Sequence, residues 1–369
     1  MDIGTLRQRL RALGAGPAHE ARVLRHWAQG LPLQGGRRRP EDFLPKALRQ
    51  ALPALADELA ALARLQSAHP GADGSVRLLL ALRDGQSIES VLLPPQRSQG
   101  LCVSTQVGCA VGCVFCMTGQ GGLLRQLGSA EIVAQVALAR TAYAARPVRK
   151  VVFMGMGEPA HNLDAVLEAI ELLGTAGGIG HKQLVFSTVG DARAFESLHA
   201  LGPGRVRPAL ALSLHSTDPA RRAALLPRAP RLSPAELVEQ GDRYARASGY
   251  PLQVQWTLIE GVNDGDDEVE GIAALLAGRH ALMNLIPYND VPGLVLRRPS
   301  WERAAAMARA LHRRGVLTKL RRSAGQDVEA GCGQLRARAG AGAGAGVGVG
   351  ASAPLVFVPP PPRPQSRSQ

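Results

Sequence analysis

The sequence predicts an α/β protein whose core is a partial, TIM-like barrel of about six parallel strand–helix units. Between about residues 101 and 320, short apolar runs typical of buried parallel strands alternate with amphipathic helical patterns. Polar motifs follow directly after several of these apolar runs. Because the active sites of such barrels lie at the carboxyl ends of the strands, the motifs predict one shared functional site.

The helices and strands of this core each have a local sequence signal. Four predicted helices begin at capping residues, which are Ser129, Asn162, Ser233 (with Pro234 and Glu236 in a capping box) and Ser300. A further helix is predicted near 268–276. The predicted strands are 151–154, 184–187, 208–214, 252–258, 281–286 and 316–320. Repeated strand–helix units of this kind imply a parallel sheet.

Two smaller parts are expected before the core. Leucines recur at helical spacing in residues 1–72, which predicts a helical accessory domain that binds RNA. Its basic turn at 35–40 is either an RNA-contacting surface or a solvated loop. Two strand-like runs, 76–82 and 88–93, are joined by an Asp-Gly turn and predict a hairpin within the connecting segment 73–100.

The core is expected to cover residues 101–336, followed by a disordered tail at 337–369. The stretch from Ala339 to Pro362 carries no charge, so a membrane span has to be considered. Glycine at every second position and a proline run make a spanning helix unfavourable. We therefore expect no membrane partner.

The composition favours a cytoplasmic protein with a polyanionic partner. There are 43 Lys and Arg residues against 30 Asp and Glu, a net charge of +13, which suggests RNA. The alternative is a coding bias toward Arg, Ala, Gly and Pro, which raises the charge without any function. Five cysteines do not form a secreted disulfide framework, and the first residues do not form a signal peptide. A monomer is expected.

Three cysteines, Cys109, Cys113 and Cys116, lie within eight residues in the spacing C-x-x-x-C-x-x-C, with Phe115 before the last. Three thiolates on one loop can hold three irons of a [4Fe–4S] cluster and leave the fourth iron open. The alternative is structural zinc, which would require a second pair of ligands that this sequence lacks nearby. The motif resembles that of the radical S-adenosylmethionine (SAM) superfamily, in which SAM binds the open iron.

Further motifs lie in a fixed order along the chain: Leu101–Cys109, Phe153–Pro159, Ser187–Gly190, Ser213–His215, Gly261–Asp264, Asn284–Asn289 and Ala330–Leu335. In this order they resemble the RlmN/Cfr family of radical SAM methyltransferases, which act on adenine in RNA. The resemblance runs from about residue 20 to 336. It implies a partial barrel behind a small helical N-terminal domain, in agreement with the elements predicted above.

The resemblance also implies a mechanism that uses the two remaining cysteines. Cys332 takes a methyl group from one SAM, and a second SAM is cleaved to a 5′-deoxyadenosyl radical that removes hydrogen from this S-methyl group. The resulting carbon radical attacks adenine, at C2 in preference to C8, in 23S rRNA or tRNA. Cys102 then attacks the Cys332 sulfur and releases the product as a disulfide forms. Each turnover would use two SAM molecules and an electron donor such as flavodoxin or ferredoxin.

The remaining candidate site residues are carried over from the same family. Glu89 corresponds to a proposed proton acceptor, and the alternative for it is an exposed strand carboxylate. The residues expected to bind SAM are Gly157, Glu158, Ser187, Ser213, Leu214, His215 and Asn289. Among them, His215 is expected to form a wall of the cofactor pocket and not to act as an acid or base.

Basic residues near the end of the core are a further candidate surface. Arg313 and Arg314, together with the run 319–322, either hold phosphate or form a solvated face. Two other functions would also use a cysteine loop of this kind. A glycyl-radical activase would not need Cys332, and a non-catalytic Fe–S or zinc RNA-binding module would not cleave SAM.

Overall fold

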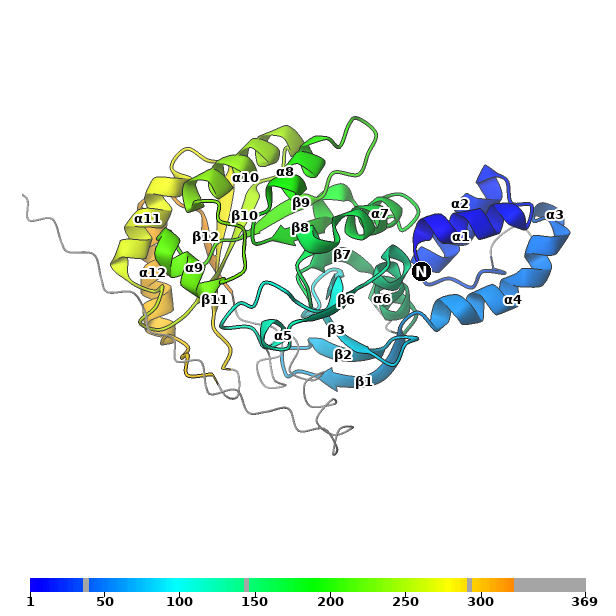
Figure 1. Cartoon of the computed structure of the whole chain (residues 1–369), viewed down its shortest axis with the longest axis horizontal. Coiled ribbons are helices and arrows are strands. Elements are labelled where there is room, and N and C mark those ends of the chain that lie inside the picture. Colours follow the sequence, from blue (N-terminus) through cyan, green and yellow to red (C-terminus); the bar gives the residue numbers. More distant parts are fainter. Residues whose placement is uncertain (36–39, 143–145, 291–293, 322–369) are drawn as a thin grey trace, which may run out of the picture.

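The computed structural model describes residues 1–35, 40–142, 146–290 and 294–321. The predicted tail at 337–369 and the candidate methyl carrier Cys332 lie outside the described residues. Figure 1 shows a curved central sheet covered by helices, with the N-terminal helices at one end of the molecule.

One ten-stranded sheet forms the centre of the structure, in the order β1-β2-β3-β4-β7-β8-β9-β10-β11-β12. Its strands are β1 (Arg64–Pro70), β2 (Val76–Ala81), β3 (Ser87–Leu92), β4 (Gln99–Cys102), β7 (Val148–Phe153), β8 (Leu184–Thr188), β9 (Ala209–Ser213), β10 (Leu252–Leu258), β11 (Ala281–Pro287) and β12 (Thr318–Leu320). Pairing is antiparallel from β1 to β4 and parallel from β4 to β12. Parallel strands that neighbour one another in chain order are the arrangement of a (βα) barrel.

The barrel is partial, because the edge strands β1 and β12 are not neighbours in the described sheet. The major helices around it are α6 (Ser129–Ala142), α7 (Leu163–Gly174), α8 (Ala192–His199), α10 (Pro234–Ser248), α11 (Asp266–Leu276) and α12 (Trp301–Arg313). The shorter elements are α5 (Met117–Gln120), α9 (Pro219–Leu225), the 3-10 helices Pro159–Asn162 and His181–Gln183, and a separate hairpin of β5 (Gln106–Gly108) and β6 (Leu123–Gln126). The predicted α/β fold with a mostly parallel sheet is confirmed.

Side chains alternate between the two faces of each strand, and the two faces differ in character. On one face, residues such as Leu101, Val151 and Phe186 join the large apolar cluster beneath the helices. We call the other face, which lines the barrel, the inner face. It carries Cys102, Val152, Val185, Ala209 and Ala211. Apolar packing against the helices therefore holds the sheet, and the inner face is left for other chemistry.

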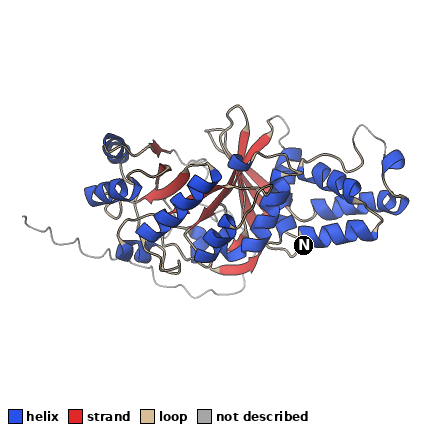
Figure 2. Cartoon of the chain, turned by 90° about the horizontal axis from the view of Figure 1, so that it is seen from above, coloured by secondary structure: helices blue, strands red, loops and turns tan. Residues whose placement is uncertain are grey.

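The N-terminal part is helical, as predicted, from α1 (Ile3–Ala12) and α2 (Pro17–Ala28) through α3 (Pro40–Phe43) to α4 (Lys46–Ala60). Figure 2 shows these helices grouped beside the helix-covered sheet. The predicted hairpin also forms, as β2 and β3. The sequence missed β1, which lies within the segment expected to be helical and pairs antiparallel with β2. Its side chains are mostly exposed, so the apolar alternation that identifies a strand is missing.

Two predicted helix caps are used differently in the structure, whereas Ser233 and Ser300 cap their helices as expected. Ser129 is the first residue of α6, and its hydroxyl accepts a hydrogen bond of 2.8 Å from the Ile3 amide. Asn162 precedes α7, but its side-chain amide donates to the carbonyls of Thr105 and Leu127, at 2.8 and 2.7 Å. Both side chains therefore connect distant segments.

In the described part of the chain, every helix is too short or too polar to cross a lipid bilayer.

Arg140 on α6 joins the N-terminal helices to the core. Its guanidinium donates to the carbonyls of Ala28 in α2, Gly177 and Val148, at 2.7, 2.9 and 2.9 Å. We expect Arg140→Met to lower the free energy of unfolding by about 2–3 kcal/mol, because three carbonyls lose a charged donor. Urea unfolding followed by circular dichroism measures the change.

The matched control is Arg193→Met, since Arg193 is an exposed arginine on α8. Its unfolding free energy should stay within about 0.5 kcal/mol of that of the unmodified protein. Equal effects of the two substitutions would contradict the role given to Arg140.

Candidate active site

The three clustered cysteines lie on a loop between β5 and α5 that backbone hydrogen bonds hold in place. The Cys109 amide donates to the Gly122 carbonyl at 2.9 Å, and the Val114 amide donates to the Leu225 carbonyl at 3.1 Å. Cys109 is buried, whereas Cys113 and Cys116 are partly accessible. The loop packs into a small apolar cluster that also contains Val111, Leu225, Leu226, Ile259 and Tyr288.

The thiols lie close enough to influence one another. Burial raises the pKa of Cys113 well above its usual value, and the charges of Cys116 and Cys109 raise it further. Burial likewise raises the pKa of Cys109 to about 12, with Cys116 and Glu158 adding to the effect. Thiolates in such a place need a positive charge, and a metal cluster supplies one.

By donor type and number, the thiols fit a [4Fe–4S] cluster. Among the described residues, no three His, Cys, Asp or Glu side chains are placed so that they could hold a metal ion as they stand. The fit therefore rests on the chemistry of the three thiols.

Arg222 on α9 is a charged group beside the thiols that sequence reasoning missed. It is buried, and its guanidinium donates to the carbonyls of Val189 and Ser213. Burial lowers its pKa to about 10, while the charges of Cys113 and Glu158 act in the opposite direction. It is thus a fixed positive charge at neutral pH. No motif marks it in the sequence, although α9 begins soon after the Ser213–His215 motif.

Glu158 holds together the loops that follow β7 and β8. Its carboxylate accepts hydrogen bonds of 3.1 Å from the amides of Ala160 and Val189. Burial raises its pKa to about 7, against the effect of hydrogen bonds from Thr188 and these amides. Gly157 before it has φ 105°, and a Cβ there would lie 2.7 Å from atoms of Gln106 and Thr105. The turn therefore requires glycine.

His215 is the one non-glycine residue with positive φ, 64°, in the described part of the chain. Its Nδ1 accepts a hydrogen bond of 2.9 Å from the Thr257 amide, and Asn263 donates to its carbonyl at 2.7 Å. Burial lowers the pKa of the ring to about 3, so it is neutral at physiological pH. The ring meets Phe115 of the cysteine loop edge-on, with centroids 4.9 Å apart. This geometry suits a pocket wall and not an acid or base.

The candidate SAM residues come together at the carboxyl ends of neighbouring parallel strands. They follow or end β7 (Gly157, Glu158), β8 (Ser187), β9 (Ser213, Leu214, His215) and β11 (Asn289). The Asn289 side chain accepts a hydrogen bond of 2.6 Å from Arg298. The structure thus groups all seven residues at one edge of the sheet, next to the cysteine loop.

Cys102 and Glu89 also lie together, on the inner face. Glu89 on β3 is fully buried, so the alternative of an exposed carboxylate is wrong. It forms an ion pair of 3.2 Å with Arg77 on β2, another residue that the sequence did not single out. Burial raises the pKa of Cys102 to about 12, and the charges of Arg77 and Glu89 act on it in opposite directions. Cys102 is therefore a protonated thiol at neutral pH.

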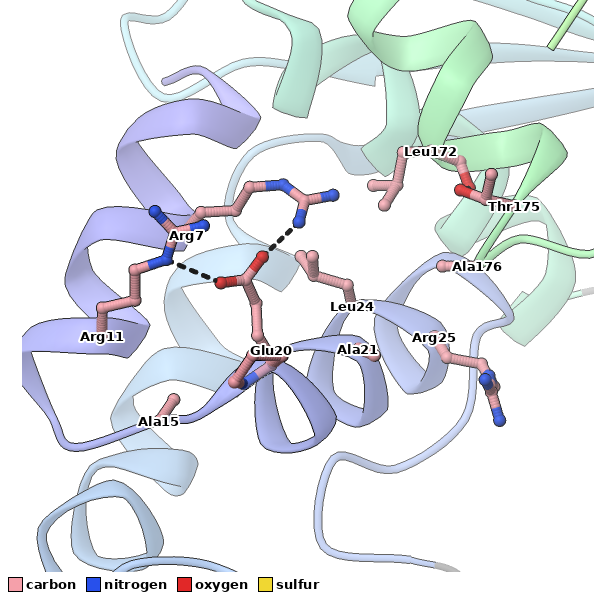
Figure 3. Close-up of a pocket in the computed structure, with 11 residues that line it drawn as sticks. Arg7, Arg11, Ala15, Glu20, Ala21, Leu24, Arg25, Leu172, Thr175 and Ala176 are labelled. Carbon is pink, nitrogen blue, oxygen red and sulfur yellow. Dashed lines mark hydrogen bonds and ion pairs between the residues drawn. The ribbon is translucent and has the colours of Figure 1, made fainter. Parts of the chain in front are cut away.

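A pocket of about 690 Å³ lies apart from this site, between α1, α2 and α7 (Figure 3). Arg7 and Arg11 line it, and both form ion pairs with Glu20. Arg25 also lines it, so three guanidinium groups share one carboxylate and the pocket has a net positive charge.

Residues 103–276 match the radical SAM superfamily. The chain is 74% identical over 337 residues to a probable RNA methyltransferase of Methylibium petroleiphilum, covering 91% of this chain and 93% of that protein. It is 69% identical to another from Leptothrix cholodnii, covering 91% and 94%. A crystal structure of a radical SAM methyltransferase from Sphaerobacter thermophilus has 34% identity and a TM-score of 0.76, covering 90% of this chain and 97% of that one.

The fold and the cysteine loop define a radical SAM enzyme, the class that uses SAM and a [4Fe–4S] cluster. Within that class, the chain belongs to the family of SAM-dependent methyltransferases formed by these relatives.

Removing one thiol should abolish the cluster. We expect anaerobically reconstituted protein to hold about four irons and matching sulfide per chain, and Cys113→Ala to hold less than about one. Cys102→Ala is the control, since Cys102 lies on β4 outside the loop, and it should keep its iron. Tightly held zinc without sulfide in the unmodified protein would contradict the assignment.

Proposed function

We propose that this methyltransferase acts on RNA and methylates a ring carbon of adenine, C2 in preference to C8, in 23S rRNA or tRNA. The names of its relatives and its net charge of +13 support an RNA substrate. The observation that carries the proposal is the placement of a partly buried thiol, Cys102, and a fully buried carboxylate, Glu89, on neighbouring strands of the inner face. Direct transfer of a methyl group from SAM to a nucleophilic nitrogen or oxygen would need neither the thiol nor the carboxylate on this face.

A ring carbon of adenine is a weak nucleophile, so direct attack on the SAM sulfonium is a poor route. When bound, the cluster and SAM supply a 5′-deoxyadenosyl radical that can remove hydrogen from a methyl group. Cys332 is proposed to carry that methyl group as a thioether. This residue lies outside the described part of the chain, so its role rests on the motif that surrounds it.

Cys102 is proposed to release the product. After the adduct has given up the ring-carbon proton and its unpaired electron, the latter to the electron carrier, the Cys102 thiolate would attack the Cys332 sulfur. An S–S bond forms while the S–C bond breaks, and the released carbon takes up a proton to become the methyl group. Because its pKa is about 12 in this structure, the thiol has to lose its proton before it attacks. Glu89 is proposed to accept the proton from the adenine carbon, and Arg77 holds its carboxylate in place.

The proposed cycle uses two SAM molecules and leaves a Cys102–Cys332 disulfide. It therefore requires electrons twice, for SAM cleavage and for the disulfide. A small redox protein such as flavodoxin or ferredoxin fits both needs, and an RNA substrate with reduced thiols puts the cycle in the cytoplasm.

The substrate can be identified by mass spectrometry of digested rRNA and tRNA. We expect a C-methylated adenosine to disappear from a strain that lacks the gene and to return when the gene is restored. A restored Cys332→Ala variant should not return it. If the modified nucleosides of the two strains are identical, the proposed function is wrong.

The covalent mechanism makes a separate prediction for Cys102→Ala. This variant should still transfer carbon to RNA but then stall, because the resolving thiol is absent. Protein purified from cells should carry nuclease-sensitive mass on the Cys332 peptide, while Cys332→Ala should carry none. Normal turnover by Cys102→Ala, without an adduct, would rule out the two-cysteine scheme.

A further inference from the structure

The inner face changes character along the sheet. On β7, β8 and β9 it carries Val152, Val185 and Ala211. On β10, β11 and β12 the same face is more polar, as strand alternation shows, although Leu282 and Ile286 of β11 also lie on it. Its polar residues there are Gln253, Gln255, Asn284, Lys319 and Arg321, since their neighbours on these strands pack under the helices.

Lys150 on β7 lies on the same inner face of the sheet as Lys319 and Arg321. It lies two residues before Val152 and is partly buried. Lys319 pairs with Asn284, whose Oδ1 accepts a hydrogen bond from Arg321, so these two cations lie beside the same side chain. Burial lowers the pKa of Lys150, and the charges of Arg321 and Lys319 lower it further, which agrees with a place on the same face.

In the described part of the chain no carboxylate forms an ion pair with these cations, whereas buried charges such as Glu89 and Glu268 have such a partner. Within the described residues, neither Lys150 nor Lys319 has an ion pair or a side-chain hydrogen bond. Arg321 uses Nε to donate to Asn284 Oδ1, at 2.9 Å. Three positive charges on one face repel one another, so the arrangement favours binding of an anion.

Asn284 supplies an independent sign of a missing ligand. It is 1% exposed, and its side-chain Nδ2 has no hydrogen-bond partner in the described structure. The bond from Arg321 fixes Oδ1, so Nδ2 is the free end of the amide. A buried donor without a partner is rare, and it indicates a ligand oxygen beside the cations.

We propose that Lys150, Lys319, Arg321 and Asn284 form a phosphate-binding subsite for the RNA backbone next to the methylated nucleotide. This inference rests on the proposed function. Lys319 and Arg321 are exposed on the edge strand, whereas Lys150 is partly buried and Asn284 is buried. A backbone phosphate can therefore stay at the open edge while its nucleotide reaches into the barrel. Lys150 pairs with Gly100 in β4, two residues before Cys102.

The SAM carboxylate is the other anion that this enzyme binds, but the position of the subsite favours phosphate. The candidate SAM residues follow the carboxyl ends of the strands, beginning at Gly157 after β7. Lys150 lies three residues before the end of β7, and because an extended strand advances about 3.3 Å per residue, it lies about 10 Å below that end. Cys102 and Val152 are paired between these two levels. The adenine would thus lie between SAM and the phosphate of the RNA backbone.

The structure also separates the basic residues that the sequence grouped together. Arg314 forms an ion pair with Glu270 of α11 and lies at the end of α12, on the helical side of the sheet. Lys319 and Arg321 face the barrel instead. Arg314→Gln is therefore a matched control, because it removes the same kind of charge nearby without touching the subsite.

The test uses reconstituted full-length protein and an RNA oligonucleotide containing the adenosine found by mass spectrometry. Lys150→Gln should weaken RNA binding about 5- to 10-fold and reduce the slope of log affinity against log salt by about one. SAM affinity and iron content should not change. Lys150→Arg should retain most of the affinity, and Arg314→Gln should stay within about twofold of the unmodified protein.

A second oligonucleotide locates the contact. It carries uncharged methylphosphonates at the phosphates that flank the adenosine. The unmodified protein should bind this oligonucleotide more weakly than the natural one. Lys150→Gln should bind the two oligonucleotides about equally, because the substitution and the methylphosphonates remove the same interaction. If the iron content of Lys150→Gln shows that it folds poorly, Lys319→Gln replaces it in the same comparison of the two oligonucleotides, because Lys319 is exposed.

Three results would overturn the subsite. If the losses of RNA-binding free energy caused by Lys150→Gln and by the methylphosphonates simply add, Lys150 does not contact these phosphates. Weaker SAM binding with unchanged RNA binding assigns the cations to the SAM carboxylate. Unchanged binding of both ligands leaves the cations without this role. If the unmodified protein binds no RNA at all, the proposed function fails, which is a different result.

Discussion

Burial of charge is the constraint on which this site depends. Inside the barrel and at its carboxyl end, each charged group needs a partner, because water cannot solvate it there. Glu89 has Arg77, and Glu158 has the amides of Ala160 and Val189. Arg222 lies near Glu158 and the Cys113 thiol, so the cysteine loop is part of the same balance. A cluster bound to the three cysteines therefore enters a site whose charges are already arranged around it.

The division of the sheet into two faces makes this arrangement possible. The outer face and the helices form one apolar cluster, which contains Trp256, Phe153 and Phe186. Its packing is independent of the chemistry on the inner face. Polar and charged side chains can therefore be placed along the inner face without disturbing this apolar cluster, provided that each buried charge has a partner. A barrel of this kind separates stability from function by the simple alternation of side chains along a strand.

The sequence predicted the strand–helix order and the position of the cysteine loop, because apolar runs, caps and ligand spacing are local signals. It missed β1, whose edge position leaves few buried side chains, and the use of Ser129 and Asn162 as ties between distant segments. The sequence did not identify Arg77, Arg222 and Lys150 as site residues for a similar reason. Their partners lie far away in sequence, and an isolated basic residue in an arginine-rich chain carries no local signal. Such residues are recognised only when the fold brings their partners together.

The protonated state of Cys102 has a consequence for how the enzyme tolerates air. Thiolates react with peroxide and alkylating agents, whereas a thiol whose pKa is about 12 is almost inert at neutral pH. Oxygen would therefore attack the cluster first and leave Cys102 unmodified. Damage of this kind is repairable, because iron and sulfide can be supplied again to an intact polypeptide. Burial of the thiol would therefore protect it until a new cluster is bound.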